Sequence, residues 1–194
     1  MINRVTLMSL SEELNRHNIV WGVGGSYLLQ LHNLYSEPND LDLWVQPNDI
    51  LNIREIFKGF PEIETDIPLP KDLHFKMMYY DIEVDFVACF ITKPNQYQFT
   101  YNIEPENIKM IDLDGMQIPC TYLEDWYIVY RLLKRDDKAN LIQKVFSKKK
   151  IPLDEHAIQR AIDNEQTKIP LRLKKDVYEL ITSATQMTLF DYDR

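Results

Sequence analysis

The residues Asp40-Leu41-Asp42-Leu43-Trp44-Val45 carry the most informative pattern in this chain. Its acids alternate with apolar residues, which is the period-two pattern of a strand with one polar face and one buried face. Asp40 and Asp42 are therefore expected on one side of a sheet, with the two leucines on the side of the core.

A second stretch, Ile82-Glu83-Val84-Asp85-Phe86, repeats this alternation later in the chain. Its acids face one way and its apolar residues the other, so Asp85 is expected to join Asp40 and Asp42 on the polar face. Three carboxylates on one face repel one another unless a positive charge lies between them. Hard divalent cations with oxygen ligands are the usual solution, and two such ions can hold both the attacking and the leaving oxygen of a phosphoryl transfer.

The turn Gly24-Gly25-Ser26 ends fourteen residues before Asp40. It is expected to present bare backbone N–H groups at the start of a helix, where a phosphate binds well, and Ser26 is expected to cap that helix. The glycine turn and the three acids together indicate a metal-dependent enzyme that acts on a nucleoside triphosphate.

These elements resemble the DNA polymerase β-like nucleotidyltransferase superfamily. That family is marked by Gly-Gly-Ser or Gly-Ser, a short helix, Asp-x-Asp on a strand and a third aspartate on a later strand. The resemblance covers residues 19–90, with a weaker echo in residues 121–140. It is greatest to small bacterial members, namely lincosamide and aminoglycoside nucleotidyltransferases and AbiEii-type toxins.

The resemblance implies an activity and a set of site residues. The activity is transfer of a nucleoside monophosphate from a nucleoside triphosphate, such as ATP, to an acceptor hydroxyl, with release of pyrophosphate. Asp40, Asp42 and Asp85 would be the catalytic residues and would bind Mg²⁺, with two ions expected and Mn²⁺ as an alternative. The turn Gly24-Gly25-Ser26 would bind the triphosphate.

Competing motif assignments fit the same residues less well. A calcium-binding loop that starts at Asp40 would need a glycine and a glutamate where the chain has Val45 and Leu51. A dinucleotide fingerprint would begin at Gly22, but Tyr27 replaces its third glycine, and no Gly-Lys-Ser/Thr follows for a P-loop. A catalytically silent nucleotide-binding module, or a toxin–antitoxin-type interaction module of the same fold, stays open as the alternative.

Basic residues are more frequent in the second half of the chain than in the first. Residues 1–110 hold 8 Lys and Arg against 16 Asp and Glu, whereas residues 111–194 hold 14 of each. In the small bacterial relatives, bases on a helix after the sheet approach the nucleotide phosphates. Arg131, Lys134 and Arg135 resemble those bases, and their spacing predicts that they share one helix face.

The acceptor is the least determined part of the prediction. A net charge of −8 argues against duplex DNA as a partner and slightly favours a small molecule over RNA or protein. The loop Pro61–Lys71 and the helices after residue 121 are expected to wall a small-molecule pocket. An RNA acceptor would instead contact Lys148-Lys149-Lys150. Glu37 departs from the family pattern, in which a base is frequent just before Asp-x-Asp.

The composition is that of a globular protein, with 45% hydrophobic and 27% charged residues. No apolar run approaches the ~18 residues of a membrane span, and the N-terminus has no apolar leader-like segment. The sequence therefore predicts a cytoplasmic protein without membrane contact. Cys89 and Cys120 lack metal-ligand spacing and are expected to be buried and reduced.

The order of elements predicts an α+β fold, a nucleotidyltransferase-like mixed β-sheet flanked by helices with a helical C-terminal portion. The catalytic core is expected over residues 1–120 and the helical portion over residues 121–194. Expected strands are 19–21, 40–46, 74–79, 82–90, 109–113 and 116–120, the last two joined by an Asp114-Gly115 turn. Expected helices are 5–16, 27–33, 50–58, a helix to residue 134 opened by a capping box at Thr121 and Glu124, 138–146, 154–163 and 171–185.

Overall fold

The computed structural model describes residues 2, 4–65, 70–91, 97–100, 103–165 and 167–189 of the 194-residue chain. The chain divides into two compact units. The first unit comprises residues 1–90 and 101–122, and the second comprises residues 91–100 and 123–194. The first unit contains the sheet and both acidic strands, so it is the unit that holds the predicted catalytic residues.

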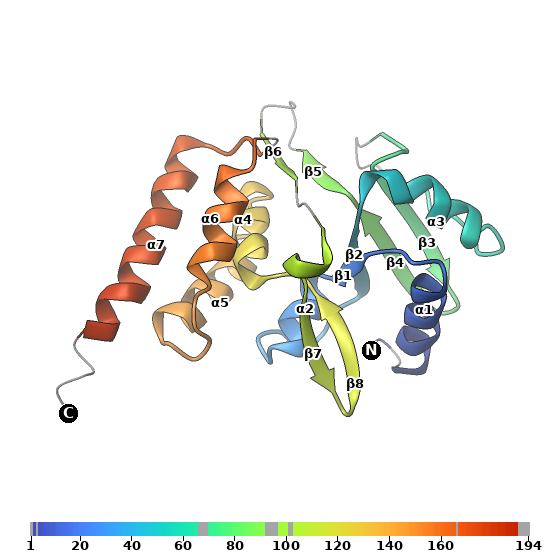
Figure 1. The fold of residues 1–194 in the computed structure, drawn as a ribbon, viewed down its shortest axis with the longest axis horizontal. Helices are drawn as coiled ribbons and strands as arrows, with labels where there is room; N and C mark the ends of the chain where they lie inside the picture. The colour runs from blue at the N-terminus through green and yellow to red at the C-terminus, as the bar shows by residue number, and fades with distance from the viewer. Residues whose placement is uncertain are drawn as a thin grey trace. The chain divides into compact units, whose positions relative to one another are not determined.

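The first unit is built on a mixed sheet, which the described residues form with the strand order β3-β4-β2-β1-β8-β7 (Figure 1). The strands are β1 (Trp21–Val23), β2 (Asp40–Val45), β3 (His74–Tyr79), β4 (Ile82–Val87), β7 (Lys109–Leu113) and β8 (Met116–Cys120). β2 runs parallel to β4 and antiparallel to β1, and β1 runs parallel to β8. The pairs β3–β4 and β7–β8 are antiparallel hairpins. This sheet confirms the predicted α+β fold.

Both hairpins turn at residues with positive φ. The β3–β4 turn contains Tyr80 at φ 53°, and the β7–β8 turn contains Asp114 at 51° and Gly115 at 86°. Two successive residues with positive φ are the mark of a type I′ turn, which Asp-Gly favours. The prediction of the second hairpin is therefore confirmed at residue level.

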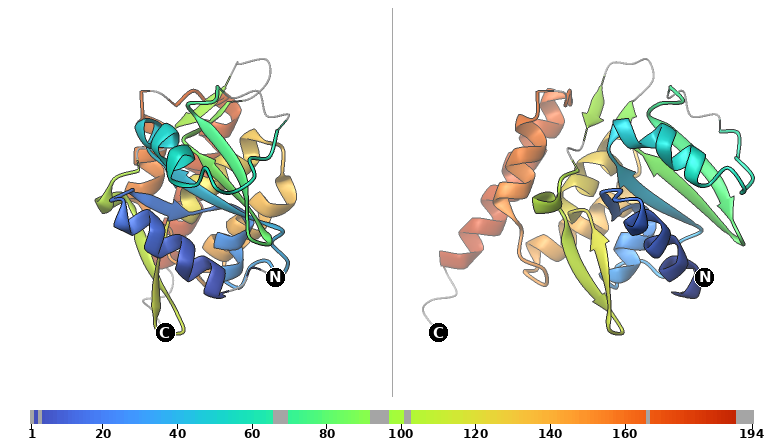
Figure 2. Two further views of the ribbon diagram at one scale, coloured as in Figure 1. Left: turned by 90° about the vertical axis from the view of Figure 1, so that its right-hand side faces the viewer. Right: turned by 45° about the vertical axis from the view of Figure 1, so that its right-hand side comes forward.

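One face of the sheet packs against helices α1 (Arg4–Arg16) and α3 (Ile50–Ile56), which lie on the same side of β3 and β4 (Figures 1 and 2). Phe57, just after α3, has its ring centroid 5.9 Å from that of Phe86 and 5.7 Å from that of Tyr79. The Ser9 hydroxyl of α1 forms a 2.9 Å hydrogen bond with the Tyr79 hydroxyl. Because side chains alternate along a strand, burial of this apolar face turns the acids of β2 and β4 to the opposite face.

The outer edge of β3 is partly covered. An isolated β-bridge joins Glu62 to Met77, with backbone hydrogen bonds of 2.9 Å on either side of it. Covering an edge strand in this way blocks its pairing with another chain. The covering segment begins the predicted loop Pro61–Lys71, of which residues 66–69 lie outside the described part of the chain.

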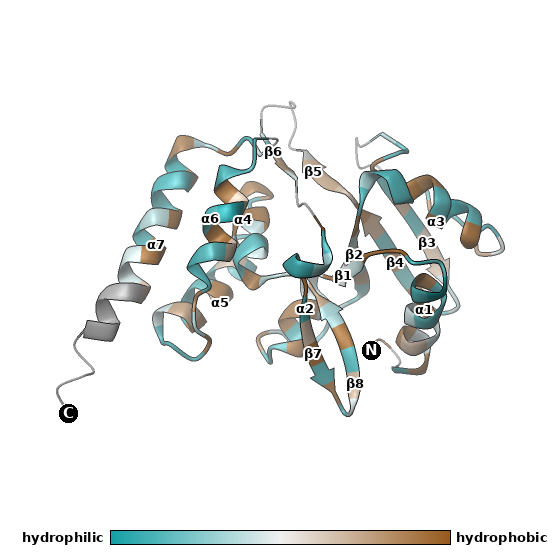
Figure 3. Ribbon diagram, viewed as in Figure 1, coloured by the Kyte–Doolittle hydropathy of each residue, from teal (hydrophilic) through white to brown (hydrophobic). Residues whose placement is uncertain are grey.

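The second unit is mainly helical, with α4 (Leu123–Leu132), α5 (Asp136–Ser147), α6 (Glu155–Asp163) and α7 (Leu171–Leu189). Each helix carries both apolar and hydrophilic residues (Figure 3). The largely buried α4 packs against the other three helices, so it is the centre of this unit. The Asp154 carboxylate caps α6 by accepting the Ala157 N–H at 3.0 Å. None of the helices in the described residues is both long and apolar enough to cross a lipid bilayer.

Several predicted boundaries in the first unit are wrong. The strand predicted over residues 19–21 is observed two residues later, as β1 (Trp21–Val23). The strand predicted over residues 82–90 ends at Val87, and a separate strand β5 (Cys89–Ile91) leads into the second unit, which also contains β6 (Gln98–Thr100). Helix α2 (Gly25–Leu31) begins before Ser26, with Gly24 at the N-cap and no side-chain capping bond. Ser26 therefore does not cap the helix, because the Gly24 carbonyl already accepts the first intrahelical bond, from Leu28 N–H at 3.0 Å.

The residues of the predicted capping box also make hydrogen bonds to distant segments of the chain. The Thr121 hydroxyl donates to the Val23 carbonyl at 2.9 Å and fastens the end of β8 to β1. The Glu124 carboxylate accepts the Asp154 N–H at 2.7 Å and so ties α4 to the start of α6. Both side chains therefore join segments that are distant in sequence.

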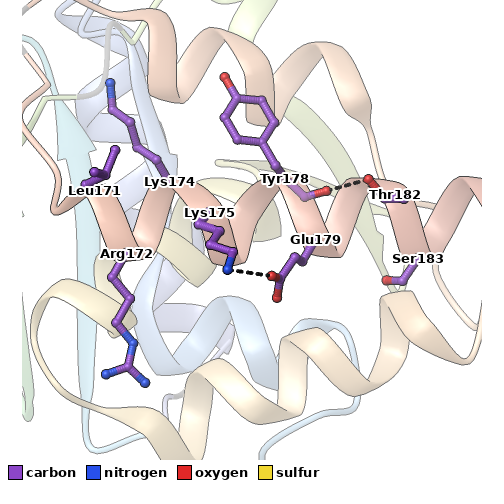
Figure 4. Close-up of a pocket in the computed structure, with 8 residues that line it drawn as sticks. All are labelled: Leu171, Arg172, Lys174, Lys175, Tyr178, Glu179, Thr182 and Ser183. Atoms are coloured by element: carbon purple, nitrogen blue, oxygen red, sulfur yellow. Dashed lines mark hydrogen bonds and ion pairs between the residues drawn. The ribbon is translucent and has the colours of Figure 1, made fainter.

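The exposed face of α7 carries an open hollow of about 910 Å³ (Figure 4). Its lining residues all come from this helix: Leu171, Arg172, Lys174, Lys175, Tyr178, Glu179, Thr182 and Ser183. Lys175 lies 3.8 Å from Glu179, and the Thr182 hydroxyl donates to the Tyr178 carbonyl at 2.9 Å. A single helix provides its described lining, so the hollow is a helix surface and not an enclosed site.

Candidate active site

The acids of β2 and β4 meet on the face of the sheet opposite α1 and α3. In the parallel pairing of β2 with β4, Asp42 lies opposite Asp85 and Asp40 lies opposite Glu83. Neighbouring strands are about 4.8 Å apart, so these carboxylates are close neighbours. Asp85 is buried, whereas Asp40 and Asp42 are partly exposed. The structure thus brings the three predicted aspartates onto one face and adds Glu83 to them.

The glycine turn lies directly against Asp42. The Gly24 N–H donates to the Asp42 carbonyl at 2.9 Å, and Gly25 follows with φ +58°. A Cβ at position 25 would overlap the Asp42 carboxylate, lying 2.5 Å from its Cγ and 2.9 Å from its Cβ. Only glycine combines this backbone conformation with such a close approach. The turn therefore fixes the start of α2 beside the acidic strand, where the first N–H groups of the helix have no acceptor within it.

Two basic side chains of β3 reach the acidic face. His74 Nε2 is in hydrogen-bonding contact with Asp85 Oδ1, and Lys76 Nζ lies 2.7 Å from Glu83 Oε2. Lys76 is opposite Asp85 in the β3–β4 register, so each basic side chain leans toward its diagonal neighbour on β4. On its other side, His74 Nδ1 lies 3.5 Å from the Thr65 hydroxyl. β3 therefore supplies the ammonium of Lys76 and the imidazole of His74 that face the acids.

A hollow of about 280 Å³ opens beside β3 in the first unit. It is lined by Arg54, Glu62, Ile63, Glu64, Thr65, Lys71, His74, Phe75 and Lys76. Arg54 is held there by an ion pair with Glu62 and by the ring of Phe75, 4.6 Å from its guanidinium carbon. Because His74 and Lys76 line the hollow and also contact acids of β4, the hollow adjoins the acidic face.

The donor atoms of the acidic face suit a hard divalent cation by their chemistry, because all of them are carboxylate oxygens. Among the described residues, however, no three Asp, Glu, His or Cys side chains are arranged around a common point that could hold an ion. Asp85 contacts His74 instead, and Lys76 provides positive charge beside it. Asp40, Asp42 and Asp85 therefore fit an ion by residue type and register, and these basic contacts would have to rearrange when it binds.

The three bases predicted for nucleotide binding do not share a helix face. Arg131 is in the last turn of α4, which ends at Leu132, whereas Lys134 has φ 57° and Arg135 is the N-cap of α5. The chain reverses at Lys134, so the shared-face prediction is wrong. Nucleotide binding by these residues stays a prediction.

Arg131 has a structural task within the second unit. Its guanidinium pairs with Asp136 at 2.6 Å and donates to the side-chain oxygens of Asn140 at 2.7 Å and Gln143 at 2.9 Å. All three partners belong to α5. Arg131 therefore fastens α4 to α5, and a nucleotide would compete with these acceptors for it.

The run Lys148-Lys149-Lys150 ends α5. Lys148 is the C-cap of that helix, and Lys149 adopts φ 52°. Positive charge is favourable at a helix C-terminus, so the position of these lysines has a structural explanation. A contact of the run with RNA stays a prediction.

The two cysteines are buried and unpaired with each other. Burial, followed by the charge of Asp72, raises the pKa of Cys89 to about 11, and burial raises the pKa of Cys120 to about 12. A thiol becomes nucleophilic only as the thiolate, so neither side chain is suited to catalysis at neutral pH. Their predicted burial is confirmed.

Local sequence patterns predict no role for His74, which lacks ligand spacing, and do not single out Lys76. A signal is nevertheless present, because His74-Phe75-Lys76 alternates along the strand next to Asp85 and places both bases on one face. That signal has meaning only once β3 is known to pair with β4 in this register.

No family description and no curated protein matches this sequence. Solved structures match in fold. The antibiotic-resistance factor ANT(2'')-Ia aligns with a TM-score of 0.54 and 11% identity over 80% of this chain and 88% of its own. LnuA, a lincosamide antibiotic adenylyltransferase solved with lincomycin bound, aligns with a TM-score of 0.50 and 6% identity over 74% of this chain and 98% of its own.

A third match is a provisionally assigned nucleotidyltransferase from Thermotoga maritima, TM1012. It aligns with a TM-score of 0.50 and 21% identity over 76% of this chain and 96% of its own. At these identities the likeness is one of fold. The chain has the fold of small bacterial nucleotidyltransferases, as the resemblance in its motifs predicted.

Proposed function

We propose that this protein transfers a nucleoside monophosphate from a nucleoside triphosphate to a hydroxyl of a small-molecule acceptor and releases pyrophosphate. The observation that carries the proposal is the pairing of Asp42 with Asp85 on neighbouring parallel strands, with the Gly25 turn held against Asp42. A binding-only site has no need to gather carboxylates, because they repel a triphosphate. With a divalent cation bound, the same carboxylates would hold the ion that contacts the phosphates.

Asp40, Asp42 and Asp85 are the proposed ligands of Mg²⁺, with two ions expected and Mn²⁺ as an alternative. When bound, such ions supply charge neutralisation on the transferred phosphoryl group and orient the attacking and leaving oxygens. We further propose that Asp85 helps to deprotonate the acceptor hydroxyl, with His74 in contact with one of its oxygens. The Gly25 and Ser26 amides at the start of α2 are the proposed donors to the triphosphate.

Two observations favour a small-molecule acceptor. LnuA was solved with lincomycin bound, and ANT(2'')-Ia was solved in complex with adenylyl-2''-tobramycin. The hollow beside β3 adjoins the acidic face and is lined by residues of the predicted acceptor loop, Glu62–Thr65 and Lys71. We assign this hollow to the acceptor.

The test is incubation of the protein and Mg²⁺ with each α-labelled NTP in the presence of hydroxylated antibiotics, total RNA or cell protein. The proposal expects label in a small-molecule product, equimolar pyrophosphate and no label without Mg²⁺ or Mn²⁺. Label in RNA that is lost when Lys148-Lys149-Lys150 is changed to glutamate would instead make RNA the acceptor. No labelled product with any NTP would contradict the enzymatic proposal.

One observation favours the alternative, a nucleotide-binding or toxin–antitoxin-type module without turnover. The Lys76 ammonium offsets part of the negative charge of the acidic face, and His74 contacts Asp85. The two functions differ in how NTP raises the melting temperature. The enzyme requires Mg²⁺ for this stabilisation and loses it with EDTA, whereas the module keeps it in EDTA.

We expect His74→Ala to lower kcat about 10- to 100-fold while the KM for NTP changes little, because partners that orient a metal ligand have effects of this size. His74→Gln keeps a side-chain N–H donor and should recover part of the loss. His17→Ala is the control. His17 is exposed, follows the end of α1 and lies beside Glu13 of that helix. Equal kcat values for the three variants would remove His74 from the site.

A further inference from the structure

Lys76 occupies an unusual position for a lysine. It lies within β3, opposite Asp85, and its side chain is only 15% exposed. A buried ammonium is unfavourable unless it is paired, so its partners show what holds it there. The nearest is Glu83, whose Oε2 is 2.7 Å from Nζ.

The charge of Lys76 is shared by more than one acid. Burial opposes the charged form, but the hydrogen bond to Glu83 and the charges of Asp85 and Asp40 together raise the pKa of Lys76 above its ordinary value. Asp40 lies on β2, so the field of this ammonium extends across β4 to the next strand. Two of the three proposed ion ligands are therefore attracted to Lys76.

We propose that Lys76 is the counter-cation of the acidic face and that its positive charge weakens the binding of a divalent ion to the neighbouring Asp40 and Asp85. The inference rests on the proposed function only for the identity of the ion ligands. Lys76 then offsets the mutual repulsion of the acids and raises the Kd of a divalent ion at this face.

Glu83 is the direct partner of the Lys76 ammonium. It holds Lys76 directly and lies opposite Asp40 at the margin of the face, where its side chain is 45% exposed. When an ion takes the aspartates, Lys76 keeps this partner and its charge remains satisfied. The ammonium and the ion would then be close neighbours of like charge.

The experiment measures Mn²⁺ binding without any nucleotide, from the free Mn²⁺ signal in electron paramagnetic resonance. Lys76→Met is expected to tighten the Kd for Mn²⁺ by about tenfold, because a positive charge a few Å from a divalent ion repels it even at the effective dielectric of a protein surface. Lys76→Arg keeps the charge and should bind Mn²⁺ within about twofold of the unaltered protein. Lys58→Met is the matched control. Lys58 is exposed, follows the end of α3 and pairs at 2.5 Å with Glu55 of that helix.

Thermal unfolding gives a second readout. In EDTA, Lys76→Met should melt at a lower temperature than the unaltered protein, and saturating Mn²⁺ should close this gap. An unchanged Kd in Lys76→Met, an equal tightening in Lys76→Arg, or a Lys76→Met protein that stays unfolded in Mn²⁺ would each overturn the proposal. These outcomes are independent of turnover, so a protein without transferase activity can still support the role of Lys76.

Discussion

Asp42→Asn should abolish nucleotidyl transfer while the protein stays folded. Asp42 is the proposed ion ligand that faces both Asp85 and the glycine turn. Its carboxylate would therefore hold the ion beside the reacting phosphate. Loss of a metal ligand removes several kcal/mol of transition-state stabilisation, which corresponds to a fall in kcat of about a thousandfold or more. The measurement is pyrophosphate release under saturating NTP and Mg²⁺.

The melting temperature of the same variant separates a chemical from a structural effect. Asp42→Asn removes one of several like charges from the acidic face, so the unfolding temperature in EDTA should stay equal or rise. Asp81→Asn is the matched control, since Asp81 is an exposed acid in the turn that precedes Asp85. Activity above a few per cent in Asp42→Asn would remove Asp42 from the ion site.

Gly25→Ala should lower both stability and activity. An alanine there would keep the left-handed backbone at a cost of about 1–2 kcal/mol, and its Cβ would push the Asp42 carboxylate out of place. Displacing a catalytic group by about 1 Å can cost roughly a hundredfold in rate, so we expect a loss of that order in kcat. Urea unfolding and the pyrophosphate assay measure the two effects.

Two other glycines separate the causes. Gly115→Ala carries a positive φ of 86° with nothing within 4 Å of the new Cβ, so it should show the backbone cost without loss of activity. Gly59→Ala has open space and no positive φ, so it should change neither quantity. A fully active Gly25→Ala would mean that the approach of Gly25 to Asp42 has no part in the site.

The order and type of most elements could be predicted from local patterns. The hairpin of Lys109–Leu113 with Met116–Cys120 is predicted with its observed bounds, because strand alternation and Asp-Gly chemistry act between near neighbours in sequence. The strand predicted over 82–90 is too long, since the apolar run continues past Val87 while the chain bends at Ala88. The cap predicted at Ser26 is wrong because capping depends on where the helix starts, which Gly24 and the backbone of β2 decide.

Local alternation in the sequence is enough to show which residues bring charge to one face of each acidic strand, because a strand turns every second side chain to the same side. The sequence also determined that position 25 is a glycine where the chain needs a left-handed turn. The register that sets Asp42 opposite Asp85, with His74 and Lys76 facing them, is visible only in the folded chain, because strand order and register are set by packing between segments far apart in sequence. The prediction that Arg131, Lys134 and Arg135 share one helix face is wrong for the same reason. α4 ends at Leu132 and the chain turns before α5.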